Sequence, residues 1–430
     1  MNLLQLVPGA GNTFYCENCL RDNSLAKVLH KMGHDITIIP LYLPILTDEE
    51  LLKSGMPVFF GGINVYLQQK LGIFRKTPRW IDKLFDSPAL LKMVAGKAGM
   101  TRASELGEMT LSMVRGEDGN QSKELDRLIS WLNSLERPDV IQLSNALLLG
   151  MAKRIKEDVK VPVICTLQDE DIWLDAIPEP QRSVIWDAIA EKAAYVDEFI
   201  AVSNYYRDFM CERLKLPKEK VHVVYNGLNT EGYEVSDVSF DPPVIGFLER
   251  QCREKGLEVL VEAFIIIKKN ARIPNAKLRI AGGKTGDDER FVKTLQKRIQ
   301  KEGISSDVEF LPNLNRQDKI QFLKSLSVLS VPAVHKEAFG IYIIEALAAG
   351  VPIVQPNHGA FPELIDYTCG GITYEPNDPQ TLARTLETVI LTPDGSRQLG
   401  RQGRKVAIER FTVERMAQGV VRVLEKLPNL

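Results

Sequence analysis

Short apolar runs alternate with helical patterns along most of the chain. The expected buried strands are NLLQLV, HDITIIP, PDVIQLS, VPVICTL and EFIAVS in the first half, and PVIGFL, KLRIAG, DVEFLP, LSVLSVPA and VPIVQP in the second. Because these runs are continuously apolar rather than alternating, they predict parallel strands that are covered on both faces. Helical patterns of about 10–15 residues separate them, so we predict an α/β protein with doubly wound parallel sheets.

The pattern breaks once, at residues 229–243, where the sequence NTEGYEVSDVSFDPP is acidic, polar and ends in two prolines. Such a stretch is typical of a linker. We therefore predict an N-terminal domain over residues 1–228 and a C-terminal domain over residues 243–410, a division that suits a chain of 430 residues. An amphipathic pattern over residues 411–430 predicts a final helix that packs on either domain.

Residues 45–125 lack the strand–helix repeat and are expected to be an insertion in the first domain. Within them, residues 70–102 carry eight Lys or Arg residues against two Asp, with Phe, Trp and Leu interleaved. This composition fits two interpretations. One is a membrane-surface or acceptor-binding segment, and the other is a set of core-facing helices with a solvated basic face.

Composition narrows the range of partners. The formal net charge is −2 and the hydrophobic share is 44%, which is ordinary for a globular protein and gives no indication of nucleic-acid binding. No apolar run reaches the roughly 18 residues that a spanning helix needs, and no leader segment is recognised. Six cysteines are few for this length. A reducing cytoplasm is the expected location, with membrane contact through residues 70–102 as an addition.

Two stretches of the sequence resemble nucleotide-binding motifs, but each lacks a glycine that its motif requires. VPGAGNTF resembles a dinucleotide-binding fingerprint, but Phe14 occupies the position of the third glycine. AGGKTGDD resembles a phosphate-binding P-loop, but Leu278 stands where its first glycine is required. Neither stretch therefore predicts its motif's ligand.

The sequence contains two patterns that could bind a metal, but neither is specific. Cys16 and Cys19 form a C-x-x-C pair that fits a redox site or half of a zinc site, but a second ligand pair at zinc spacing is missing, so packing and turn roles are preferred. Asp169 and Asp171 have the D-x-D spacing of metal-dependent sugar transferases, which also occurs often in surface loops. We predict no metal and no cofactor.

Two basic residues occupy a junction that suits phosphate binding. Arg250 and Lys255 lie where the expected strand PVIGFL passes into a helix. Strand-to-helix loops lie at the carboxyl edge of the sheet, where open α/β folds bind ligands. The Arg fork and the Lys charge suit a diphosphate, and the alternative is two solvated cations.

Two glutamates flank a predicted helix start in HKEAFGIYIIEALAAGVPIV. Glu337 precedes the turn, and the amides near Gly340, Ile341 and Tyr342 would form an anion site at the helix N-terminus. Glu345 lies within the helix among apolar residues, where an unpaired carboxylate is costly. It would accept hydrogen bonds from a ribose diol, or form a buried ion pair with an Arg or Lys.

These motifs together resemble family 4 of the retaining GT-B glycosyltransferases. The resemblance is carried by R-x4-K before KG, the NG of VVYNGLN, the AGG after LRI and, above all, E-x7-E followed by AAGVPIV. It is strong over residues 225–366 and looser over residues 1–40 and 138–228. It implies two Rossmann-like domains that face each other across a cleft, with a nucleotide-diphosphate sugar held by the second.

The resemblance also implies a role for each matched residue. Arg250 and Lys255 would bind the diphosphate and stabilise the leaving group without a metal. Glu337 would hold hydroxyls of the donor sugar, Glu345 would hold the ribose, and Gly11 would lie near the β-phosphate.

One departure from the family concerns the donor sugar. Where the family often has T-x-H-D, this chain has Gln168 in place of the histidine that would touch that sugar. The implied retaining reaction does not need an imidazole base, so activity is expected to survive, but the preference for a particular sugar is left open.

The predicted activity is therefore metal-independent transfer of a sugar, with retention, from a nucleotide-diphosphate sugar to a hydroxyl acceptor that is a saccharide or lipid-linked. Two alternatives stay open: a nucleotide-sugar epimerase of the same architecture, recognised by a changed donor without acceptor, and a non-catalytic nucleotide-sugar sensor, recognised by binding without turnover. A glycosidase that uses Glu337 and Glu345 is disfavoured, since the helical Glu345 cannot easily face the same bond. Donor base, acceptor identity and oligomeric state are not predicted.

Overall fold

The computed structural model divides into two compact units by its internal contacts. Met1–Tyr225 and Met416–Leu430 make up the first unit, and Asn226–Arg415 the second. The residues that the structure describes are 1–9, 17–42, 60, 69, 107–234, 238–286 and 288–428. Gly11, Cys16 and the basic segment 70–102 lie outside them.

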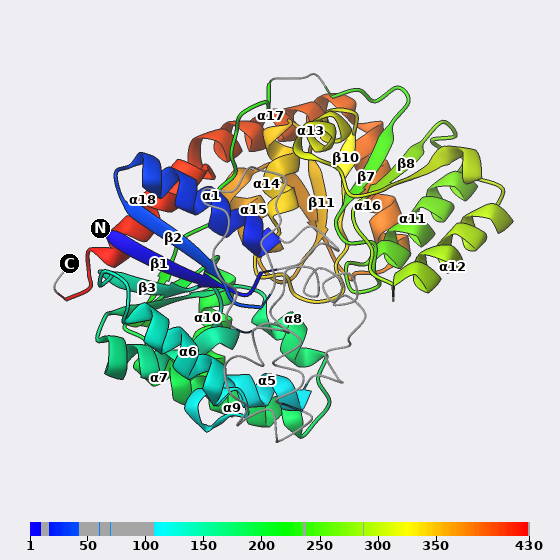
Figure 1. The fold of residues 1–430 in the computed structure, drawn as a ribbon. Helices are drawn as coiled ribbons and strands as arrows, with labels where there is room; N and C mark the ends of the chain where they lie inside the picture. The colour runs from blue at the N-terminus through cyan, green and yellow to red at the C-terminus, as the bar shows by residue number, and fades with distance from the viewer. Residues whose placement is uncertain are drawn as a thin grey trace. The chain divides into compact units, whose positions relative to one another are not determined.

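The first unit contains a parallel six-stranded sheet with the strand order β2-β1-β3-β4-β5-β6 (Figure 1). Its strands are β1 Asn2–Val7, β2 Asp35–Pro40, β3 Val140–Leu143, β4 Val163–Leu167, β5 Glu198–Ala201 and β6 Val221–Val223. Every residue of β3 and β4 is buried, as expected for strands covered on both faces. In register, Leu3 pairs with Val140 and Ile141 pairs with Val163.

Helices connect these parallel strands. They are α1 Glu17–Lys31, α5 Gly107–Val114, α6 Ser122–Leu132, α7 Ala152–Arg154, α8 Glu170–Asp175, α9 Gln181–Lys192 and α10 Asn204–Leu214. The last helix of the chain, α18 Val413–Leu424, packs mainly with this unit. A Cβ atom placed on Gly419 would lie 2.7 Å from Val224 Cγ1, so the absence of a side chain allows close approach just after β6.

The second unit repeats the architecture with the strand order β12-β11-β10-β7-β8-β9 (Figure 1). Its strands are β7 Val244–Leu248, β8 Lys277–Ala281, β9 Val308–Leu311, β10 Val328–Leu329, β11 Ile353–Pro356 and β12 Gly371–Tyr374. Its helices are α11 Leu257–Asn270, α12 Asp288–Lys301, α13 Arg316–Lys324, α14 Ile341–Ala348, α15 Phe361–Thr368, α16 Pro379–Leu391 and α17 Pro393–Arg410. All strand pairings in both sheets are parallel, so the predicted α/β class with doubly wound sheets is confirmed.

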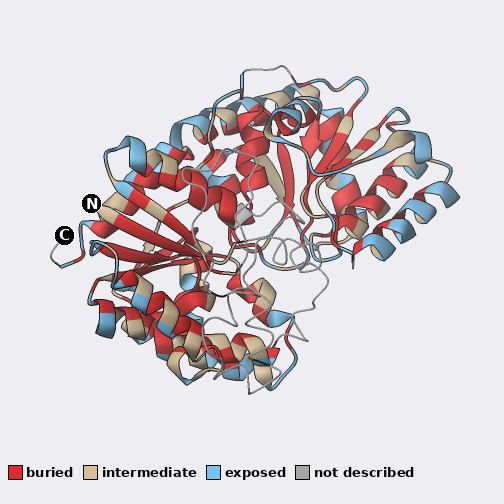
Figure 2. Ribbon diagram, in the orientation of Figure 1, coloured by how far each residue is buried: buried red, intermediate tan, exposed pale blue. Residues whose placement is uncertain are grey.

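Burial follows the amphipathic patterns of the helices (Figure 2). In α12 the buried apolar residues are Val292, Leu295 and Ile299, which share one face at helical spacing. In α14 all eight residues are buried, so this helix lies wholly inside its unit. Among the helices described, none is long and apolar enough to cross a membrane.

Candidate functional site

The strand order of the second unit marks the edge at which a ligand is expected. From β7 the chain proceeds to β8 and β9 on one side and then returns to β10 on the other side of β7. In open α/β sheets, ligands bind outside the carboxyl ends of the strands where the order reverses in this way. The loops that follow β7 and β10 flank this point, and they carry Arg250, Lys255 and Glu337.

Lys255 joins these two loops. Its ammonium nitrogen lies 2.8 Å from Glu337 Oε1 and 2.7 Å from Glu249 Oε1. Its side chain is 14% exposed and that of Glu337 only 1%, so Lys255 is not a solvated cation. The sequence predicted Lys255 and Glu337 as site residues separately, and the structure brings them into one buried cluster.

The loop between Lys255 and α11 closes tightly over the end of β10. Gly256 has a φ angle of +73°, and a Cβ atom there would lie 1.7 Å from the carbonyl oxygen of Pro332. Only glycine combines this conformation with such a close approach. The glycine therefore sets the position of the neighbouring Lys255 relative to the β10 loop.

Glu337 is held in its ionised form. Burial raises the pKa of this carboxyl, but the charge of Lys255 and the hydrogen bond with His335 outweigh it and bring the pKa to about 2. His335 Nε2 lies 3.1 Å from Glu337 Oε1. The group is thus a permanent hydrogen-bond acceptor at neutral pH.

The helix start predicted beside Glu337 is present. Gly340 has a φ angle of +88°, and α14 begins at Ile341 directly after it. The N–H groups of Ile341 and Tyr342 belong to the first turn, so they point toward the N-terminal end of the helix. All three residues are buried. Their part in anion binding stays a prediction.

Glu345 forms the ion pair that the sequence left open. Its Oε1 lies 2.6 Å from the ammonium nitrogen of Lys319, and the two side chains are 3% and 5% exposed. Lys319 belongs to α13, which begins after Asn315, whose side chain accepts the N–H of Asp318. The ribose-binding role of Glu345 is untested by this contact and stays a prediction.

Arg250 is paired with the loop after β8 rather than with Glu337. Its Nε lies 2.8 Å from Asp288 Oδ2, and its Nη2 lies 3.1 Å from Asp288 Oδ1. Its Nη2 also donates to Thr285 Oγ1 at 3.2 Å. The alternative of two freely solvated cations is therefore wrong for Arg250 as well as for Lys255. The two cations belong to different hydrogen-bonded clusters at the same edge of the sheet.

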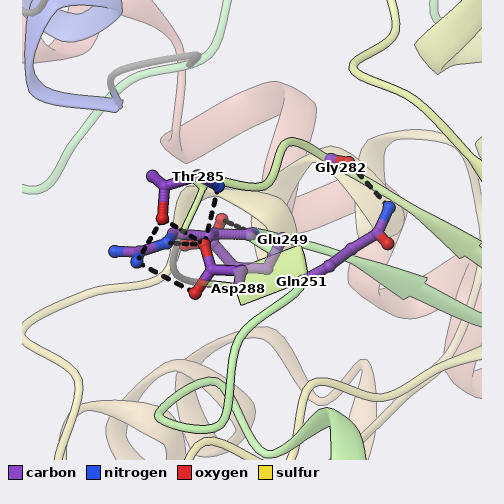
Figure 3. Close-up of polar contacts among 6 residues, drawn as sticks. Glu249, Gln251, Gly282, Thr285 and Asp288 are labelled. Atoms are coloured by element: carbon purple, nitrogen blue, oxygen red, sulfur yellow. Dashed lines mark hydrogen bonds and ion pairs between the residues drawn. The ribbon is translucent and has the colours of Figure 1, made fainter. Parts of the chain in front are cut away.

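Gln251 ties three strand ends together. Its Nε2 donates to the carbonyl oxygen of Gly282 at 2.7 Å (Figure 3). It also donates to the carbonyl oxygen of Leu311 at 2.8 Å. Gly282 has a φ angle of +143°, and a Cβ atom there would lie 1.9 Å from the carbonyl oxygen of Glu249. The loops after β7, β8 and β9 thus form one packed edge.

Sequence reasoning missed six residues of these clusters: Glu249, Gln251, Thr285, Asp288, Lys319 and His335. One signal was available for Asp288, because an acidic residue that follows a Gly-rich stretch and opens a helical pattern is typical of a helix N-terminus. Thr285 and Lys319 contact the site from positions far apart in the sequence, whereas Glu249, Gln251 and His335 lie within two residues of Arg250 or Glu337 and match no motif.

Gln168 lies in the first unit and is buried, with 2% exposure. Its Nε2 donates to the carbonyl oxygen of Ser144 at 2.7 Å, and its backbone N–H donates to Glu170 Oε2 at 2.8 Å. Its predicted contact with the donor sugar is therefore untested.

Asp171, from the D-x-D pair, lies 2.9 Å from the hydroxyl oxygen of Tyr206 and is also buried. In the part of the chain that the structure describes, no group of three or more His, Cys, Asp or Glu side chains is arranged to hold a metal ion.

Two family models match the chain in succession. Residues 117–231 match the model described as Glycosyltransferase Family 4, and residues 234–406 match the model described as Glycosyl transferases group 1. The chain belongs to this family-4 type of glycosyltransferases, and the resemblance seen in its motifs is confirmed.

Individual relatives agree with this assignment. The chain is 25% identical over 316 residues to an uncharacterized glycosyltransferase of Methanocaldococcus jannaschii, covering 70% of this chain and 78% of that protein. It is 26% identical over 257 residues to a D-inositol 3-phosphate glycosyltransferase of Saccharomonospora viridis, covering 57% of this chain and 58% of that protein.

Solved structures share the fold over nearly the whole chain. The Anabaena protein HepE, solved in complex with UDP, is similar with a TM-score of 0.69 at 17% identity and covers 99% of this chain and 100% of its own. Sucrose-phosphate synthase of Thermosynechococcus elongatus is similar with a TM-score of 0.71 at 15% identity and covers 99% of both chains. The predicted GT-B fold is confirmed.

Proposed function

We propose that the protein transfers a sugar from a nucleotide-diphosphate sugar to a hydroxyl acceptor, with retention of the anomeric configuration and without a metal ion. The observation that carries this proposal is the Lys255–Glu337 pair, with 2.8 Å between ammonium nitrogen and Oε1, at the point where the strand order reverses. A buried ammonium beside a helix N-terminus suits a departing diphosphate. Arg250 adds a second cation at the same edge.

In the proposed reaction, the acceptor hydroxyl oxygen forms a bond to the anomeric carbon while the bond from that carbon to the diphosphate oxygen breaks. The acceptor proton passes to the leaving diphosphate oxygen. Lys255, Arg250 and the amides of Gly340 and Ile341 stabilise the negative charge that develops there. Glu337 orients the donor sugar by accepting its hydroxyl hydrogens, which its low pKa permits at neutral pH.

The donor class is supported by the proteins that share the fold. HepE of Anabaena was solved with UDP and with UDP-glucose. An α-maltose-1-phosphate synthase and an α-(1→4)-mannosyltransferase are among the sequence relatives. We therefore propose UDP-, GDP- and ADP-sugars as the first donors to test.

The proposal extends to the acceptor and the location. We propose a saccharide or lipid-linked hydroxyl acceptor that binds the first unit, and a cytoplasmic protein with peripheral membrane contact through residues 70–102. Sedimentation with anionic vesicles tests the membrane contact. Loss of pelleting when all the basic residues of that segment are replaced supports it, and equal pelleting contradicts it.

The test of the activity begins with a thermal-shift screen over UDP-, GDP- and ADP-sugars, because a ligand that binds only the folded state raises its melting temperature. The stabilising donor is then incubated with and without hydroxyl acceptors, with and without EDTA. We expect release of nucleoside diphosphate and a product with the donor's anomeric configuration. A changed sugar without acceptor would indicate an epimerase, and binding without any turnover would indicate a sensor.

Replacement of both Arg250 and Lys255 by Ala is expected to abolish transfer. Lys336→Ala is the matched control, because Lys336 is exposed and immediately precedes Glu337. Donor turnover near the wild-type level in the double variant would show that the site assignment is wrong.

A further inference from the structure

Asp288 is the first residue of α12 and is buried, with 6% exposure. Its two carboxylate oxygens accept two hydrogen bonds from Arg250, at 2.8 Å from Nε and 3.1 Å from Nη2. Its Oδ2 also accepts the backbone N–H of Thr285 at 2.7 Å and the Thr285 hydroxyl at 2.8 Å. The hydrogen bonds from Thr285 therefore fix the orientation of the Asp288 carboxylate independently of Arg250.

The geometry of this contact leaves the Nη1 end of the Arg250 guanidinium available to bind an anion. A guanidinium is planar and carries five N–H groups, and Asp288 takes the side formed by Nε and Nη2. Among the described residues, Nη1 has no hydrogen-bond partner, and the Arg250 side chain is 39% exposed. One end of the fork is thus held by protein, while the Nη1 end can meet an anion.

Electrostatics favour this arrangement over a mobile side chain. Burial raises the pKa of Asp288, but hydrogen bonds from Arg250 and Thr285 outweigh it and lower the pKa, so the carboxylate stays charged. A free Arg side chain loses rotamer entropy when it is fixed by a ligand. Pairing with Asp288 fixes it before the ligand arrives.

The support beneath Asp288 is rigid as well. The backbone N–H of Asp288 donates to the carbonyl oxygen of Thr285 at 3.1 Å, so the two residues close a small turn. Figure 3 shows the Asp288 carboxylate bonded to Thr285 at one end of the cluster, with Gln251 bonded to Gly282 at the other. The loops after β7 and β8 therefore hold Arg250 from both sides.

We infer that Asp288 is a positioning residue that presents the Nη1 end of Arg250 to the terminal phosphate of the donor's nucleoside diphosphate. Asp288 itself does not touch the donor. The inference rests on the proposed function, and it adds a residue that selects a diphosphate over a monophosphate through its partner.

The experiment compares binding of UDP with UMP, GDP with GMP and ADP with AMP by titration calorimetry, and uses the pair that the wild-type protein binds. Asp288→Ala is expected to weaken diphosphate binding about tenfold or more while monophosphate binding changes less than about twofold, since hydrogen bonds to charged groups contribute at this level. Arg250→Ala is expected to have the same selective effect. The double variant is expected to bind no more weakly than Arg250→Ala, because Asp288 acts through Arg250.

Two further variants serve as controls. Asp288→Asn keeps an oxygen for Thr285 but loses the charge, so it separates helix capping from the pairing with Arg250 and is expected to weaken diphosphate binding while the protein stays folded. Glu258→Ala removes the carboxylate that pairs with Arg253 at 2.7 Å near the same loop, where both side chains are exposed. It is expected to change neither affinity.

Each outcome decides a separate question. If the wild-type protein binds none of the diphosphates, or if Arg250→Ala does not change their binding, the proposed function has been assigned to the wrong site. If Arg250→Ala acts selectively but both Asp288 variants bind as the wild type does, only the positioning role is wrong. Tighter diphosphate binding by Asp288→Ala would show that Asp288 competes with the ligand, and equal loss for both nucleotides would show a purely structural role.

Discussion

The ammonium nitrogen of Lys319 lies 2.6 Å from Glu345 Oε1 in a part of the second unit where both side chains are at most 5% exposed. The pair explains how an ionised carboxylate is accommodated in a helix that is otherwise made of Ile, Tyr, Leu and Ala. Removing one partner of such a pair leaves the other charge buried without compensation, whereas removing both need not be costly.

We therefore predict that the single variants Glu345→Met and Lys319→Met each lower the free energy of unfolding by about 3 kcal/mol. The double variant Lys319→Met/Glu345→Met is expected to lose clearly less than the sum of the single losses. Urea unfolding followed by circular dichroism measures all the variants. Strictly additive losses would mean that the two charges do not stabilise each other.

Glu345 is also the residue predicted to hold the ribose. If it accepts hydrogen bonds from the ribose diol, the wild-type protein binds a nucleoside diphosphate about tenfold more tightly than its 2′,3′-dideoxy analogue. Glu345→Gln is expected to reduce this ratio, measured by calorimetry on the folded variant. A ratio that stays at the wild-type value would assign Glu345 to the ion pair alone.

The strands could be predicted from the sequence wherever they lie inside a sheet. The ten apolar runs all form strands, but β6 and β12 were missed. Both missed strands lie at a sheet edge, and they are only three and four residues long. Their sequences, VHV and GITY, include a polar or small residue, because an edge strand is less enclosed than a central one.

The site was predictable only in part, for a physical reason. Arg250, Lys255 and Glu337 stand between strand ends and helix starts, which local patterns locate, and Glu345 is recognised as a charged residue within an apolar helix. Their partners depend on which loops meet, and that is decided by tertiary packing. Asp288 reaches Arg250 from the next strand's loop, and Lys319 reaches Glu345 from a separate helix.

A buried tyrosine in the first unit lies between two carboxyl groups. The hydroxyl oxygen of Tyr206 lies 2.7 Å from Glu170 Oε2 and 2.9 Å from Asp171 Oδ1, and it accepts the N–H of Glu170 at 2.9 Å. Burial raises the pKa of Tyr206 well above its usual value, so the hydroxyl keeps its single hydrogen. It can donate to only one carboxylate, which favours a proton on the other.

This arrangement predicts that ionisation of Asp171 lowers the free energy of unfolding as the pH rises. Burial, aided by the charge of Glu170, raises the pKa of Asp171 from 3.8 to about 6. Between these values the folded state binds a proton that the unfolded state has released, so the free energy of unfolding falls as the pH rises, by about 3 kcal/mol in all.

The variant Asp171→Asn removes this titration and keeps a donor for the Tyr206 oxygen. It is expected to be more stable than the wild type by about 2–3 kcal/mol above pH 6 and equally stable near pH 4, as measured by urea unfolding across that range. Asp187→Asn, at an exposed position in α9, is the control and is expected to leave the pH profile unchanged. A constant difference between Asp171→Asn and wild type at all pH values would contradict the prediction.

Gly256 and Gly303 separate the cost of backbone conformation from the cost of a steric clash. Their φ angles are +73° and +74°, but a Cβ atom at Gly256 would lie 1.7 Å from Pro332 O, whereas at Gly303 it would meet nothing within 4 Å. Gly303→Ala should therefore cost about 1–2 kcal/mol of stability, which is the penalty of the left-handed conformation alone.

Gly256→Ala should cost more than Gly303→Ala, because the loop must also move away from the β10 loop. Since Lys255 precedes this glycine, its distances to Glu249 and Glu337 should change as well. We expect donor turnover to fall at least tenfold in Gly256→Ala, measured well below its melting temperature, and to stay near the wild-type value in Gly303→Ala. If both variants lose stability equally and keep turnover, the close approach at Gly256 does not position Lys255.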